Sequence, residues 1–455
     1  MAVDRSRLPE PGPEPTFVFP EIRRRVLPSG LRIWTIEHHA VPIVSFLALL
    51  PVGSAADPGG RPGVAAVTAD LLDEGAGDLD ALQLHEAIGR IGAQFDTEIG
   101  ADATVLSLTA LAQFAERGAA LLADMLIRPR LEQRDFNRVR ELRLNRLIQL
   151  RDMPPTLADR AFTELLYRSH PYGHLAIGTE TSLGAMTLAE VSSFHAHAYS
   201  PARVTIVAAG SASHDRLAAL AEGAFGSWTP TRGLDLPDVT RAAVQPTAER
   251  LAVLHRAGAA QSELRVGHVA ASRSTPDYHA LVALNMVLGG QFVSRINMNL
   301  REGKGYTYGA RTSFEFRRGR GPFVLAASVQ SDATADALHE IFSEISAIRG
   351  ERPVTRVELD LGCAALTRGY PRNFETAEQV SRAAAQLALF DLPDDYFTTF
   401  VPRVLELDET DLTRAAEKHI DPSQLLTVIV GDREKVAPTM ERLALGEPAD
   451  VVIAR

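Results

Sequence analysis

The 455-residue chain has one cysteine, Cys363, and very few lysines among its 47 basic residues. A single cysteine excludes a disulfide within the chain and every zinc or iron–sulfur site built from several thiolates. The 57 acidic residues give a formal net charge of −10, whereas a general nucleic-acid binder needs an excess of positive charge. We therefore expect no nucleic-acid partner.

Long apolar runs are also missing. The first 25 residues carry prolines and scattered charges where an export signal needs a basic start followed by an unbroken apolar stretch. No window approaches the roughly 20 apolar residues of a membrane helix. We therefore expect a cytoplasmic protein without a membrane partner. The composition, 45% hydrophobic and 23% charged, is sufficient for large cores and for at least two lobes.

One pattern recurs after 221 residues, close to half the chain length. Residues 187–210 and 408–431 each contain a polar helix start, an amphipathic helix, a proline, an apolar strand and a closing glycine. The proline marks the break between helix and strand because its ring cannot continue a helix. At the same offset, a strand near Val41 falls on a strand near Ser262. The halves are therefore predicted to share one fold.

Residues 229–247 contain three prolines and no sustained period, which predicts a surface linker. The linker separates an N-terminal lobe, residues 17–228, from a C-terminal lobe, residues 248–455. Both lobes alternate apolar strands with amphipathic helices. The clearest of these are strands 31–37 and 322–329 and helices 114–126 and 335–348. The sequence predicts an α+β fold of two homologous lobes, each a largely antiparallel sheet with helices packed on one face.

Four stretches follow one another in a characteristic order. They are LPSGLRIWTIE (27–37), GVAAVTADLLDEGAG (63–77), HPYGHLAIGTETSL (170–183) and LGGQFVSRINMNLREGKGYTYGARTSF (288–314). In this order they resemble the insulinase/pitrilysin metallopeptidases, and more closely the two-subunit branch that includes the mitochondrial processing peptidases and bacterial relatives. The resemblance spans nearly the whole chain past residue 17.

The catalytic lobe of that family binds zinc through His-x-x-Glu-His on a helix, with the glutamate as general base. The matching positions of this chain hold Ala66, Ala69 and Asp70. A third ligand of the family, a glutamate, falls near Asn145 or Arg146. The resemblance therefore implies a degenerate zinc site in the first lobe. It implies no metal or cofactor in this chain, and zinc in a partner subunit.

No other residues form a replacement site. Glu141, one helical turn from the third ligand position, is a single carboxylate and cannot hold a hydrolytic zinc. The closely spaced histidines are predicted in a turn, on different faces of a helix and at a strand end: His170 and His174, His195 and His197, and His38 and His39. Cys363 lies among small residues and is predicted to be buried and inert. A G-x-S-x-G motif for serine catalysis is missing.

Arg301 and Tyr308, seven residues apart in the fourth stretch, match a paired arginine and tyrosine of the family. Both side chains can donate hydrogen bonds to the negative charge that develops on a scissile carbonyl oxygen. In the family this pair comes from the second half and faces the zinc-bearing half across a cavity, and in the two-subunit branch the site is shared between chains. Tyr306 is the competing hydroxyl, expected on the same strand face as Tyr308. The spacing from Arg301 favours Tyr308.

The resemblance implies the zinc-free subunit of a heterodimeric metallopeptidase, inactive alone, that pairs with a homologous zinc-binding chain and acts on peptides or unfolded proteins. Two alternatives remain: a structural core subunit without activity, and a peptide-binding module that does not cleave. Pairing of two identical copies also remains open. A functional Arg301 and Tyr308 would argue against the structural subunit, which has no chemical need for either group.

Overall fold

A computed structural model describes residues 17–230, 233, 235–245 and 249–449. Three expectations fall wholly or partly outside these residues. They are the lack of an export signal in residues 1–16, part of the expected linker, and the end of the expected C-terminal lobe at residues 450–455.

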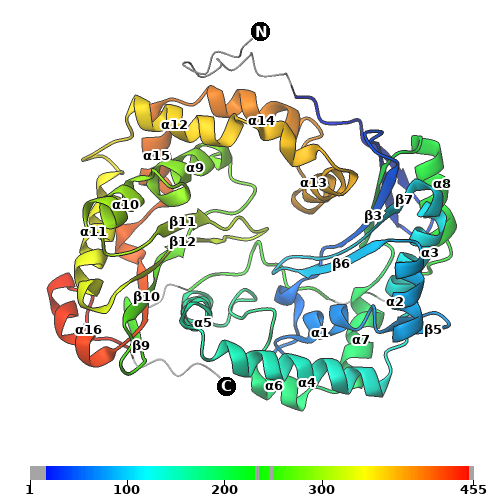
Figure 1. Cartoon of the computed structure of the whole chain (residues 1–455), viewed down its shortest axis with the longest axis horizontal. Coiled ribbons are helices and arrows are strands. Elements are labelled where there is room, and N and C mark those ends of the chain that lie inside the picture. The colour runs from blue at the N-terminus through cyan, green and yellow to red at the C-terminus, as the bar shows by residue number, and fades with distance from the viewer. Residues whose placement is uncertain (1–16, 231–232, 234, 246–248, 450–455) are drawn as a thin grey trace, which may run out of the picture.

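The first half of the chain builds a six-stranded sheet in the order β1-β2-β8-β3-β7-β6 (Figure 1). The strands are β1 (Arg23–Val26), β2 (Arg32–Glu37), β3 (Ile43–Leu50), β6 (Gln94–Ile99), β7 (Thr104–Leu111) and β8 (Thr205–Gly210). Neighbours run antiparallel except β2 and β8. Along β3, Val44 and Phe46 enter one core, whereas Leu47 and Leu49 enter another. The sheet is therefore apolar on both faces, as the alternation of strand side chains requires.

The second half builds a five-stranded sheet in the order β11-β12-β10-β13-β9. Its strands are β9 (Leu251–His255), β10 (Gln261–Val269), β11 (Ala310–Phe314), β12 (Pro322–Gln330) and β13 (Leu426–Gly431). Only β13 and β9 run parallel. Read as β9-β13-β10-β12-β11, the order repeats β2-β8-β3-β7-β6 of the first sheet. The predicted α+β class with two largely antiparallel sheets is confirmed.

Helices alternate with these strands in both halves. The first half contains α1 (Val64–Asp70), α2 (Ala81–Arg90), α3 (Ala115–Ile127), α4 (Gln133–Leu150), α5 (Pro154–Tyr167), α6 (Glu180–Ala185), α7 (Leu188–Ala198) and α8 (His214–Phe225). The second contains α9 (Tyr278–Asn285), α10 (Arg295–Asn297), α11 (Thr334–Ala347), α12 (Arg356–Thr367), α13 (Ala377–Phe390), α14 (Tyr396–Leu405), α15 (Glu409–His419) and α16 (Arg433–Met440). Two π-helical turns, η3 (Met286–Gly290) and η4 (Met298–Gly303), flank α10. Among the described helices, none is long and apolar enough to cross a membrane.

The predicted repeat is correct in one unit and shifted in the other. α7 and α15 lie 221 residues apart, and so do β8 and β13. In the first sheet Val44 pairs with Gly210, the last residue of β8. In the second sheet Glu263 pairs with Val430, the residue before the end of β13. The counterpart of Ser262 is therefore Val44 rather than Val41, because the connections between these strands differ in length.

Each sheet has one face covered by a helix from the other half of the chain. α3 and α8 cover one face of the first sheet, and α13 of the second half packs on β3 and β8 at the other face. Conversely, α5 of the first half packs on β10 and β13. Figure 1 shows the orange α13 beside the blue strand β3. Helices supplied by a sheet's own half thus cover one face, as predicted, and the exchanged helix covers the face for which no helix was predicted.

A buried ion cluster joins α5 to the second sheet. The guanidinium of Arg265 on β10 donates to Asp159 of α5, to Glu263 and to the carbonyl oxygen of Pro155. Glu263 also accepts a hydrogen bond from Ser328 of β12. Arg265 and Glu263 are buried, so each charge depends on the other groups of the cluster rather than on water.

The connection between the halves differs in part from the predicted surface linker. Its described residues form neither helix nor strand. Val239 is buried and joins the core around α5, so the connection does not lie entirely on the surface. The lobe boundaries at residues 228 and 248 stay predictions.

Replacing Arg265 should destabilise the chain because Glu263 would keep a buried charge without its partner. We expect Arg265→Leu to lower the free energy of unfolding by about 3–5 kcal/mol, measured as a lower urea midpoint. The matched control is Arg90→Leu, which removes an exposed ion pair with Glu86 and should leave the midpoint almost unchanged. Equal midpoints for the two variants would contradict the importance of the cluster.

Candidate functional site

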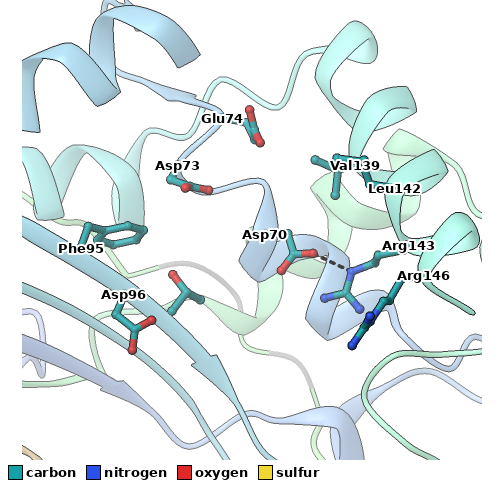
Figure 2. A pocket seen from close by; sticks show the side chains of 10 residues that line it. Asp70, Asp73, Glu74, Phe95, Asp96, Val139, Leu142, Arg143 and Arg146 are labelled. Carbon is teal, nitrogen blue, oxygen red and sulfur yellow. Dashed lines mark hydrogen bonds and ion pairs between the residues drawn. The ribbon is translucent and has the colours of Figure 1, made fainter. Parts of the chain in front are cut away.

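The expected zinc position is an open pocket of about 470 Å³ between the end of α1, strand β6 and helix α4 (Figure 2). It is lined by Asp70, Asp73, Glu74, Phe95, Asp96, Thr97, Val139, Leu142, Arg143 and Arg146. Among the three motif positions, Asp70 reaches this pocket, whereas Ala66 and Ala69 are buried and carry no donor atom.

A guanidinium group binds the carboxylate at this position. Nε of Arg143 on α4 donates to Oδ2 of Asp70 on α1 at 2.6 Å (Figure 2). Arg146, one of two expected third-ligand positions, also lines the pocket, whereas Asn145 and Glu141 do not. Arg143 was not among the residues predicted from the sequence. Its spacing of three residues from Arg146 could have revealed it, since such residues share a helix face.

These residues do not fit a zinc ion. A hydrolytic zinc site needs three protein ligands, usually histidine, glutamate, aspartate or cysteine. Here Asp70 is the single candidate among the motif positions, and Arg143 already neutralises it. Across the residues with described positions, no three histidine, cysteine, aspartate or glutamate side chains are grouped to hold a metal.

Asp73, which lines this pocket, has a raised pKa. Burial raises the pKa of Asp73 to about 6, and the charge of Glu74 adds to the effect. His85 acts in the opposite direction, and its Nε2 lies 3.5 Å from Oδ2 of Asp73.

Arg301 and Tyr308 line a second open pocket, of about 530 Å³. Its walls come from the segment between η3 and β11, from strands β10 and β12, and from the start of α5 at Pro155. The two pockets share no lining residue. The structure thus brings the two predicted residues together, in a place separate from the degenerate metal position.

The segment that carries both residues is fixed at its base. The Asn297 side chain accepts a hydrogen bond from the backbone N–H of Ala310 and donates one to its carbonyl oxygen. Arg295, buried beside it, donates twice to Glu358 of α12. Thr307 donates to the carbonyl oxygen of Ser328 on β12. The backbone around Arg301 and Tyr308 is therefore tied to the sheet and to α12.

The two tyrosines of this segment differ in environment. Tyr308 is 95% exposed, whereas Tyr306 packs against the core of the second half. Both residues lie in the loop between η4 and β11, so the prediction that they share a strand face is wrong. The strand begins only at Ala310, where the base formed by Asn297 closes the loop. Tyr308 lines the pocket and Tyr306 does not, and the choice of Tyr308 as the functional hydroxyl stays a prediction.

Two of the other candidate histidines have structural contacts. Nε2 of His174 lies 3.0 Å from Oδ2 of Asp57, and Nε2 of His195 lies 3.0 Å from the carbonyl oxygen of Leu126. Cys363 is buried as predicted, and burial raises the pKa of its thiol. A buried thiol with a raised pKa is a poor nucleophile.

We expect the purified chain to retain no stoichiometric zinc. Incubation with zinc followed by gel filtration should leave the metal content, measured by atomic emission, equal to that of an Asp70→Asn variant. The physical reason is that Arg143 forms an ion pair with the carboxylate of Asp70 and that the other two motif positions are alanines. One tightly bound zinc per chain that depends on Asp70 would contradict this description.

Asp73 should make the stability of the chain depend on pH. The pKa of Asp73 in the folded state, about 6, lies above the ordinary value of 3.8. Between these two pH values the folded chain therefore binds more protons than the unfolded chain does, and its stability falls as the pH rises from about 4 to about 6. Asp73→Asn lacks this decline. Its stability relative to the unchanged chain should therefore increase by about 2–3 kcal/mol over that range, measured by urea unfolding at several pH values. The exposed Asp78→Asn is the control and should show no such change.

Two models of one peptidase family match most of the chain. The model described as insulinase (peptidase family M16) matches residues 32–180, and the model described as peptidase M16 inactive domain matches residues 185–366. An uncharacterized zinc protease of Mycobacterium leprae is 26% identical over 76% of this chain and 77% of its own length. A probable mitochondrial-processing peptidase subunit beta of Schizosaccharomyces pombe is 24% identical over 48% of this chain and 47% of its own.

Solved structures share the fold. A peptidase M16 inactive domain from Pseudomonas fluorescens has a TM-score of 0.83 at 24% identity, covering 90% of this chain and 98% of that one. A protease from Helicobacter pylori also has a TM-score of 0.83, at 20% identity, covering 91% of this chain and all of the other. The two family models, which together match most of the chain, show that the chain belongs to the insulinase family, peptidase family M16.

Proposed function

We propose that this chain is the zinc-free subunit of a two-subunit metallopeptidase, and that Arg301 and Tyr308 complete a site whose zinc is held by a homologous partner with an intact His-x-x-Glu-His motif. The observation that carries the proposal is a contrast between two pockets. Arg143 neutralises the single motif carboxylate at the degenerate metal position. Arg301 and Tyr308, by contrast, line one open pocket.

The chemistry of the pair supports this role. Addition of water to a peptide bond places negative charge on the carbonyl oxygen, and donors already aimed at that oxygen lower the barrier. Arg301 offers a permanent charge and several N–H groups, and Tyr308 offers one O–H. The tied backbone of their segment would hold both donors without further ordering when the substrate binds.

The exposure of Tyr308 argues against a purely structural subunit. At 95% exposure, its ring contributes little to any core, and its hydroxyl makes no hydrogen bond to the described residues. An aromatic side chain left in solvent beside a tied loop has no evident use in folding. The same side chain is well placed to meet a peptide or a second subunit.

The substrates we propose are peptides or unfolded segments, because an open pocket shared between two chains has to admit an extended backbone. We propose a cytoplasmic location for the complex. The most direct support for the heterodimer would be an adjacent coding sequence for a similar chain that carries the intact zinc motif.

Co-expression with such a partner should give a complex that cleaves a labelled unfolded peptide, whereas the chain alone should not. In the complex, Tyr308→Phe or Arg301→Ala should each lower kcat by about 100-fold to 1000-fold, because each removes a donor to the developing charge. Zinc content, measured on the same samples, should not change.

The matched control is Tyr306→Phe, which makes the same substitution on the tyrosine that packs against the core. Its turnover should stay near that of the unchanged complex. Normal turnover of both Tyr308→Phe and Arg301→Ala would refute the shared site. A stable complex with zinc but without cleavage would favour a structural subunit, and peptide binding by the chain alone would favour a binding module.

A further inference from the structure

An exposed aromatic ring covers the guanidinium of Arg301. Cζ of Arg301 lies 3.2 Å from the ring centroid of Phe292, which follows η3 and is itself 70% exposed. The Arg301 side chain keeps only 12% of its surface exposed, although it lines an open pocket. The ring therefore shields the cation on one face while remaining in contact with solvent.

Such a ring has a physical cost that requires an explanation. A phenylalanine in water loses the free energy of burial, which favours large apolar side chains inside. Arginine, in turn, has a long side chain that samples many rotamers unless a contact restrains it. A stacked ring attracts the cation and fixes the plane of its N–H groups. The contact thus orders a donor in advance, which is what stabilisation of a developing charge requires.

Glu302 accepts hydrogen bonds from two of the three nitrogens of the same guanidinium. Nε and Nη2 of Arg301 both donate to Oε1 of Glu302, at 3.0 and 2.6 Å. The Glu302 side chain is 53% exposed, and exposed ion pairs contribute little free energy. Within the described part of the chain, Nη1 of Arg301 makes no hydrogen bond. A ligand oxygen can therefore replace Glu302 at low cost.

We propose that Phe292 is a positioning residue for Arg301, and that Glu302 is an internal ligand that a peptide carbonyl oxygen displaces. The reaction that uses the positioned cation rests on the proposed function, whereas the contact among these three residues does not require a partner. Phe292 should act on turnover, because it orients a donor that is needed most in the transition state. Glu302 should act on peptide affinity, because it competes with the incoming oxygen.

The first test uses the isolated full-length chain labelled with ¹⁵N-arginine. Stacking should shift the Nε–H proton signal of Arg301 upfield through the ring current, and Arg301→Lys identifies the signal by its loss. Phe292→Leu should remove the upfield shift, and Phe292→Tyr should keep it. Leu82→Ala on α2, which alters a side chain that is 71% exposed and distant in sequence, should leave the signal in place. An unchanged signal in Phe292→Leu would overturn the proposal.

The second test uses the complex with the zinc-bearing partner and a labelled unfolded peptide. Phe292→Leu should lower kcat by about 10-fold with little change in KM, because a misoriented donor costs rate rather than binding. Phe292→Tyr should restore kcat, and Glu302→Gln should lower KM. Normal kcat in Phe292→Leu would overturn the positioning role, and an unchanged KM in Glu302→Gln would overturn the competitor role. A complex that is inactive with the unchanged chain would count against the proposed function instead, and the signal of Arg301 would still decide the contact with Phe292.

Discussion

Both sheets bury both of their faces, and this constraint couples the two halves of the molecule. The helices of each half cover one face of their own sheet, so the other face needs a helix from elsewhere. α5 and α13 supply it by crossing between the halves. Burial of the second face therefore couples the two halves, and Arg265 adds a buried charge contact to the apolar one. The same crossing brings the start of α5 to the pocket of Arg301 and Tyr308.

At the degenerate metal position, the cation that bridges α1 and α4 is a side chain of the protein, the guanidinium of Arg143. The guanidinium of Arg143 meets Asp70 and satisfies its charge. A side-chain cation can link two helices as a metal does, but it has no open coordination position for water or substrate. The first half thus retains its helix packing without the chemistry of zinc. The fold persists because packing and catalysis depend on different atoms.

The second pocket has the opposite character, because its backbone is fixed while the phenol of Tyr308 is exposed. Asn297 closes the loop at Ala310, and Thr307 holds it to β12. These hydrogen bonds hold the backbone of the loop in place. The phenol of Tyr308 can therefore remain in solvent while the segment stays ordered. The ring of Phe292 lies against the guanidinium of Arg301 and restrains that side chain as well. A site with a fixed backbone and an open pocket is suited to a partner that binds from outside the chain.

The sequence by itself determined the elements, the repeat and the residues that are missing. Apolar periodicity located strands such as β2 and helices such as α3, because burial imposes a period on each type of element. The resemblance to the insulinase family pointed to Arg301, Tyr308 and the positions at which the zinc ligands are missing. Only the tertiary structure decided that Arg143 meets Asp70, 73 residues away, and that helices cross between the sheets. Those contacts depend on the direction of side chains across folded elements, and no local pattern encodes the distance between two segments that are far apart in the chain.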